Sequence, residues 1–79
     1  MKAKVYVTYK PGVLDPQGQT VCQTLRDRGQ AEVKDVRIGK YIEFELADMS
    51  KSQAESLLAK ISDELLANPI IESYRVEVP

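Results

Sequence analysis

Residues 3–9 read AKVYVTY, a run in which small aliphatic side chains alternate with larger polar or aromatic ones. Period two is typical of a strand with one buried face, so we predict a β-strand here. Val5 and Val7 would point toward the core. Lys10-Pro11-Gly12 ends this strand, because Pro11 has no amide donor and Gly12 tolerates positive φ. The opposite face of the strand would carry Lys4, Tyr6 and Thr8.

The next segment, from Asp15 to Gly29, is predicted to be a helix. Asp15 can accept hydrogen bonds from the free amides of the first turn, and Pro16 fits the first helical position. Gly29 lies where a left-handed cap would end the helix. The helix is weak by propensity, so we expect it to depend on packing against a sheet. Its narrow apolar stripe consists of Gly18, Val21, Cys22 and Leu25.

Period two returns from Glu32 to Ala47 and predicts a β-hairpin. Gly39-Lys40 would supply the turn between its two strands. Val33 has the wrong parity for the first of these strands, so an irregular entry or a bulge is expected there. The side chains that share a face are Val36 and Ile38 before the turn and Ile42, Phe44 and Leu46 after it.

A second helix is predicted from the capping-box spacing of Ser50 and Gln53. Asn68-Pro69 ends it, because Pro69 cannot continue a helix and disfavours helical geometry at the preceding residue. The tail from Ile70 to Val78 ends in alternating apolar residues and predicts a last strand. The apolar face of the helix consists of Ala54, Leu57, Leu58, Ile61 and Leu65.

The predicted order of elements is therefore β-α-β-β-α-β. Right-handed crossovers would give an α+β fold of the ferredoxin-like type, with a four-stranded antiparallel sheet and two helices on one face. We predict a single domain over residues 1–79. This arrangement leaves the other face of the sheet uncovered.

The uncovered face would mix tyrosines with charges of both signs. We interpret it as the surface that pairs with a second copy of the chain, which would enlarge a thin core. A solvated face with ordinary cross-strand ion pairs is the alternative. The residues expected on this face are Tyr6, Thr8, Asp35, Arg37, Tyr41, Glu43, Glu45, Ile71, Ser73, Arg75 and Glu77.

Composition excludes several function classes. The 11 Lys and Arg against 12 Asp and Glu give a formal charge of −1, which argues against nucleic-acid and membrane binding. There is no His, the commonest general base and metal ligand. The single cysteine, Cys22, excludes an internal disulfide and fits a reducing cytoplasm. No stretch has the apolar length of a membrane span.

No set of residues predicts catalysis, a cofactor site or a metal site in this chain. Glu43 and Glu45 lie two apart on one strand, but nothing indicates the cleft that acid–base catalysis needs. Cys22 is interpreted as a small buried hydrophobe and Asp15 as a helix cap. Gly12 and Gly18 match no phosphate-binding pattern.

Three segments carry a further resemblance: KPGVLDPQG (10–18), VRIGKYIEFEL (36–46) and NPIIESYRVE (68–77). In this order and spacing, the chain resembles the PurS family over essentially its whole length. PurS proteins are small subunits of phosphoribosylformylglycinamidine (FGAM) synthase in de novo purine biosynthesis.

The resemblance implies a subunit without catalytic residues that belongs to an ATP-dependent, glutamine-hydrolysing ligase. Such a subunit would form a homodimer and join a glutaminase subunit to a synthetase subunit, supporting ammonia transfer between them. The partner subunits would use ATP, Mg²⁺ and glutamine, and this chain would bind no cofactor. The positions that the family motifs suggest as partner contacts are Lys10, Pro11, Gly12, Arg37, Gly39, Lys40 and Tyr41.

The principal alternative is a small-ligand regulatory domain of the ACT type, which shares the predicted fold and also dimerises. Lys10-Pro11-Gly12 could serve as its ligand-binding loop after the first strand. An independent enzyme is the least favoured alternative, because His and a convincing acid–base pair are both missing.

Overall fold

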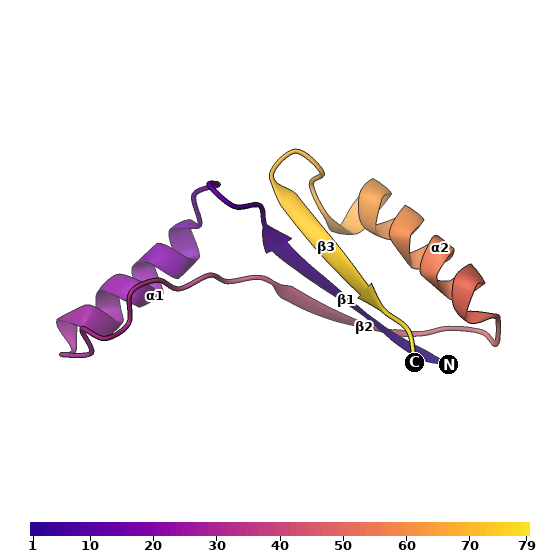
Figure 1. Cartoon of the computed structure of the whole chain (residues 1–79), viewed down its shortest axis with the longest axis horizontal. Helices are drawn as coiled ribbons and strands as arrows, with labels where there is room; N and C mark the ends of the chain where they lie inside the picture. Colours follow the sequence, from indigo (N-terminus) through magenta and orange to yellow (C-terminus); the bar gives the residue numbers. More distant parts are fainter.

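The computed structural model describes residues 1–79 and contains a three-stranded antiparallel sheet and two helices (Figure 1). The elements in chain order are β1 (Lys2–Tyr9), α1 (Pro16–Asp27), β2 (Lys40–Glu45), α2 (Lys51–Ile61), the π-helical turn η1 (Ser62–Leu66) and β3 (Glu72–Glu77). β1 lies in the middle and pairs with both β2 and β3. In this register Val5 lies opposite Ile42 and Val76. The predicted α+β class is confirmed.

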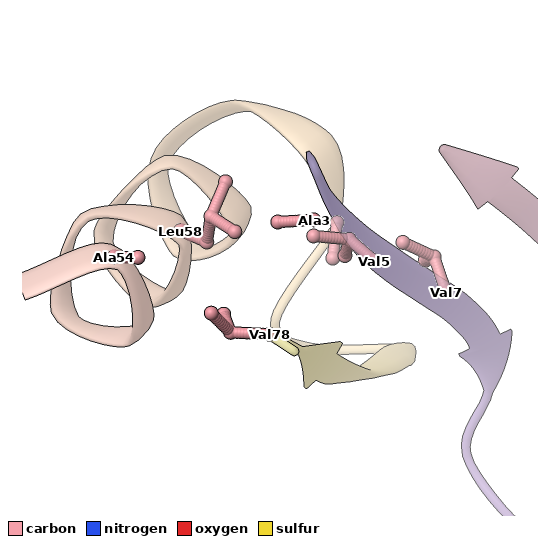
Figure 2. Close-up of a cluster of buried hydrophobic side chains, with 7 residues drawn as sticks. Ala3, Val5, Val7, Ala54, Leu58 and Val78 are labelled. Atoms are coloured by element: carbon pink, nitrogen blue, oxygen red, sulfur yellow. The ribbon is translucent and has the colours of Figure 1, made fainter. Parts of the chain in front are cut away.

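The core forms between one face of β1 and the inner side of α2. Val5 is completely buried, as the period-two pattern predicts, and Ala54 and Leu58 of α2 lie in the same cluster across from β1 (Figure 2). The capping box at the start of α2 is also confirmed, because Ser50 Oγ accepts from the Gln53 amide at 3.2 Å and Gln53 Oε1 accepts from the Ser50 amide at 3.1 Å. The buried cluster consists of Ala3, Val5, Val7, Ala54, Leu58, Ala67 and Val78.

The predicted hairpin over residues 32–47 is wrong. Only its second half is a strand, because residues 33–39 form no ladder and Gly39 leads directly into β2 without a turn. Side-chain oxygens take amides that a ladder would use: the Ile38 amide donates to Asp15 Oδ2 at 2.7 Å, and the Val36 amide donates to Asp35 Oδ1 at 2.9 Å. The sheet therefore has three strands in place of the predicted four, in the order β-α-β-α-β.

The prediction of two helices on one face of the sheet is not confirmed either. α1 belongs to an arm, residues 10–39, that projects beside the sheet (Figure 1). The helix packs against the returning segment 33–38, and Gly18 faces the Val36 carbonyl. A Cβ at Gly18 would collide with the Val36 carbonyl oxygen, which explains the glycine there. The returning segment of the arm thus takes the place of the sheet as the packing surface of α1.

The predicted cap of α1 is confirmed. Asp15 is 2% exposed and precedes the helix in an extended conformation. Its Oδ1 accepts from the Gly18 amide at 2.8 Å, and Pro16 occupies the first turn. One carboxylate therefore caps the helix with one oxygen and holds the returning segment with the other.

The arm makes the single chain extended. Its radius of gyration is 15.9 Å, against about 11.6 Å for a compact chain of this length. The accessible surface of 5669 Å² exceeds the roughly 4800 Å² typical of a folded monomer of this mass. Ten of the 79 residues are buried, so the core is as thin as the length implied. Neither helix has the length and apolar character needed to cross a bilayer.

We predict that Asp15→Asn destabilises the fold and changes its response to acid. The Ile38 and Gly18 amides hold the pKa of Asp15 below its ordinary value of 3.8. Its stabilising effect is therefore complete above that value and is lost as the pH falls through the lower folded-state pKa. An asparagine would place an NH₂ group against one of the two amides. Thermal melts across acidic and neutral pH should show a lower Tm near neutrality and a shallower decline on acidification.

The matched control is Asp35→Asn, which changes an exposed carboxylate on the same arm. It should change the Tm near neutral pH, and the decline of Tm on acidification, much less. Equal effects of the two substitutions would show that Asp15 has no special role in holding the arm.

Candidate partner-binding site

Most of the predicted partner-contact residues meet at the base of the arm. Arg37 Nη1 donates to the Val13 carbonyl at 3.0 Å and Nη2 donates to the Lys10 carbonyl at 3.3 Å. Arg37 therefore joins the outgoing loop of the arm to its returning segment. The sequence predicts Arg37 on a strand of the hairpin and Lys10 in the loop after the first strand, and the structure brings them together through this guanidinium.

Lys10 also binds within the chain. Its Nζ donates to the Pro69 carbonyl at 2.6 Å, and its amide donates to the Ile71 carbonyl at 2.9 Å. Lys10 and Arg37, two of the three cations predicted as partner contacts, thus hold loops together through main-chain oxygens. Their partner-binding role stays a prediction, and any partner would meet them already fixed in place.

The two predicted-site glycines serve different purposes. Gly12 is exposed and has φ of +83°, so it forms the tight turn that starts the arm. Gly39 lies against the end of β1, where a Cβ would collide with the Val7 carbonyl oxygen. Its role is close backbone approach, in place of the hairpin turn that the sequence predicted. Pro11 and Lys40 are exposed beside them.

A depression of about 300 Å³ lies at the base of the arm, lined in part by Asp15, Gln19, Asp35 and Arg37. Its charged groups do not make an acid–base pair. Asp15 is engaged by two amides and Arg37 by two carbonyls. No three His, Cys, Asp or Glu side chains come together as a metal site. Cys22 is half-buried, with its Sγ 4.0 Å from the Val33 carbonyl oxygen.

The face of the sheet opposite α2 carries a tyrosine–arginine cluster. The Arg75 guanidinium lies 4.3 Å from the ring centre of Tyr6, and the Tyr6 and Tyr41 rings are 5.2 Å apart. Tyr41, Tyr6 and the Glu77 carboxylate, in that order, raise the pKa of Lys4 beside them. Aromatic and arginine side chains often anchor interfaces, so this surface suits a partner.

The composition of that face differs in part from the prediction. Asp35 and Arg37 lie on the arm, because the strand that would have carried them does not form. Glu43 and Glu45 lie on β2 as expected and are exposed. Ile71 precedes β3 and is exposed in the connecting loop.

One exposed feature escaped the sequence interpretation. Leu65 and Ile70 are 80% and 81% exposed, although both are large aliphatic residues. The helical periodicity predicts Leu65 on the apolar face of the second helix, and the alternation of the tail predicts a strand within residues 70–78. The signal was available in the pair Ile70-Ile71, because two successive aliphatic residues after Pro69 break period two.

Comparisons with family models, curated sequences and solved structures all identify the same family. Residues 2–79 match the family model described as PurS: Phosphoribosylformylglycinamidine (FGAM) synthase. The phosphoribosylformylglycinamidine synthase subunit PurS of Bacillus subtilis (strain 168) is 47% identical over 77 residues, covering 98% of this chain and 90% of the relative.

Solved structures resemble the whole chain as well. A Bacillus subtilis PurS structure has a TM-score of 0.88 at 46% identity and covers 99% of this chain and 96% of that one. A chain of the PurLQS structure from Thermotoga maritima has a TM-score of 0.85 at 37% identity, with 98% and 95% covered. The projecting arm is therefore within the region that these structures share.

We predict that Arg37→Lys weakens the base of the arm. A lysine keeps the charge but cannot donate to two carbonyls from a planar fork. Each lost hydrogen bond lowers the free energy of unfolding by about 0.5–1.5 kcal/mol, and the exposure of Arg37 places the loss at the lower end of this range. Urea denaturation should show a lower midpoint. Arg28→Lys, at the exposed end of α1, is the control, and an equal change in both variants would contradict the role of Arg37.

Proposed function

We propose that this chain, which belongs to the PurS family of FGAM synthase subunits, acts as a non-catalytic assembly subunit of that enzyme in de novo purine biosynthesis. It would join a glutaminase subunit to an ATP-dependent synthetase subunit. The observation that carries this proposal is the likeness to a chain of the PurLQS structure, which spans 98% of this chain.

The chemistry of the reaction gives such a subunit a purpose. Ammonia released from glutamine in open solvent would be protonated and diluted. Holding two active sites in one assembly keeps it concentrated and away from bulk water. ATP, Mg²⁺ and glutamine would be used by the partner subunits, and this chain would bind none of them. The side chains at the base of the arm support this, since they are engaged with main-chain groups.

We also propose a second copy of the chain as its first partner. The accessible surface of the chain exceeds that of a compact monomer by roughly 850 Å². This excess is close to the ~800 Å² of surface that each protein buries in a standard interface. α2 packs against β3, and the residues Ile42 and Phe44 of β2 are only half-buried at the edge of the core. The arm exposes Leu14 and Val21. A copy packed between the arm and β2 would cover both apolar surfaces.

The ACT-type regulatory alternative is not favoured, because the family match spans residues 2–79 and names PurS. The cytoplasm is proposed as the compartment on the basis of the free thiol of Cys22.

Reconstitution tests the proposed function. The chain should co-elute with the glutaminase and synthetase subunits from the same organism, in the presence of glutamine and Mg-ADP. Glutamine-dependent FGAM formation should require it. Full glutamine-dependent activity of the other two subunits without this chain would refute the proposal. A thermal shift with a single amino acid and no co-elution would favour the regulatory alternative.

Sedimentation equilibrium tests the second copy. The wild-type chain should sediment at twice its 8.9 kDa mass, and Val21→Glu should shift it toward the monomer by placing a charge in the apolar interface. Thr24→Glu adds the same charge to an exposed position of α1 and should leave the dimer intact. A dimer unaffected by Val21→Glu would exclude the arm as its interface.

A further inference from the structure

The returning segment of the arm continues into β2 without reversing direction (Figure 1). We call residues 36–46 the long segment. Side chains two apart on an extended chain point to the same face. The half-buried side chains of the long segment keep this period across the junction, so both halves share the core face of the sheet. They include Val36 and Ile38 from the arm and Ile42 and Phe44 from β2.

A hairpin within one chain would break this arrangement. Directly paired residues of an antiparallel ladder point to the same face. With the predicted two-residue turn, Ile38 would pair with Tyr41. Tyr41 lies beside Tyr6 on the face opposite the core, so the turn would move Ile38 away from the core face. The long segment is therefore suited to pairing with another strand and not with itself.

The two edges of the long segment differ in their hydrogen bonds. The Leu46 amide donates to the Met1 carbonyl at 2.7 Å, so even-numbered residues of β2 turn their amides toward β1. The Ile38 amide has the same parity and donates to Asp15. Odd-numbered amides face the other edge, and that of Arg37 has no acceptor within the chain. Because β2 is an edge strand, this free edge can take up one more strand.

We propose that this free edge pairs antiparallel with the long segment of a second copy, so that two chains share one sheet. The pairing rests on the second copy proposed above and fixes its position. In a two-fold dimer, paired residues lie at equal distances from the axis. An axis at a residue sets even-numbered side chains against even-numbered ones. The aliphatic side chains of each arm then meet those of the partner's β2 on the core face, which a hairpin does not achieve.

Side-chain chemistry favours an axis at Tyr41. An axis at Lys40 would set two lysines directly opposite each other, and like charges in that position destabilise a ladder. An axis at Gly39 would set Ile38 against a lysine. An axis at Tyr41 pairs two tyrosines, which is favourable. Ile38 then lies opposite Phe44 of the partner subunit, since both are three residues from the axis.

The same axis completes a row of flat side chains on the opposite face. Within one chain the row runs from Arg75 through Tyr6 to Tyr41, with successive separations of 4.3 Å and 5.2 Å. Tyr41 ends the row and is 51% exposed. In the dimer Tyr41 meets its own copy, so the row crosses both sheets with an arginine at each end. Tyrosine and arginine are enriched in interfaces of this kind.

The pairing gives each sheet the fourth strand that the sequence predicts. This strand is residues 36–39 of the partner, and it carries the partner's α1 with it. Asp15 already ties α1 to the returning segment, so the arm is exchanged as a preformed unit. Exchange of an identical element between copies is a low-cost route to a dimer.

A proline on the free edge tests the pairing. Glu43 has the parity of that edge, so Glu43→Pro removes a donor that the ladder with β1 does not use, and edge strands tolerate proline there. We expect wild-type circular dichroism and a dimer dissociation constant at least tenfold higher in sedimentation equilibrium. Glu43→Ala is the matched control and should dimerise like the wild type.

Disulfide trapping in a Cys22→Ser background tests the register. Tyr41→Cys sets two thiols on directly opposed residues, whose Cα atoms lie about 5.5 Å apart and within disulfide range. Glu43→Cys sets them about 14 Å apart along the strands, which is beyond that range. Mild oxidation should convert the first variant to a covalent dimer on a non-reducing gel and leave the second uncrosslinked.

The outcomes separate this pairing from the proposals on which it rests. A dimer that Glu43→Pro leaves intact would overturn the strand pairing and keep the second copy. Crosslinking through Glu43→Cys and not through Tyr41→Cys would overturn the register. A monomeric wild-type chain that still co-elutes with the glutaminase and synthetase subunits would overturn the second copy and the pairing, but not the assembly function.

Discussion

The arrangement of this chain depends on one buried carboxylate. Asp15 accepts from Gly18 with one oxygen and from Ile38 with the other, and so joins the start of α1 to a segment 23 residues later. The Ile38 amide would otherwise be available to a strand ladder. By engaging it, Asp15 keeps the returning segment with α1 and away from the sheet. The three-stranded sheet and the projecting arm both follow from this pair of hydrogen bonds.

A chain built in this way lacks one layer of its core. In a two-layer α+β domain each helix buries its apolar stripe on a sheet. Here α2 does so, while α1 packs on extended backbone and Val21 remains 40% exposed. We therefore expect the single chain to be only marginally stable. Association would supply the missing layer, which couples folding to oligomeric state and to chain concentration.

Sequence alone predicted the parts that depend on local chemistry. The strand around Val5, the capping box at Ser50 and the cap at Asp15 were all correct, because each is encoded within a few neighbouring residues. The hairpin failed in part because Asp15, which takes the Ile38 amide, lies far away in sequence. The wrong parity of Val33 was the local sign that this segment is irregular. The in-chain acceptors of Lys10 and Arg37 lie 59 and 24 residues away, so no local spacing reveals them.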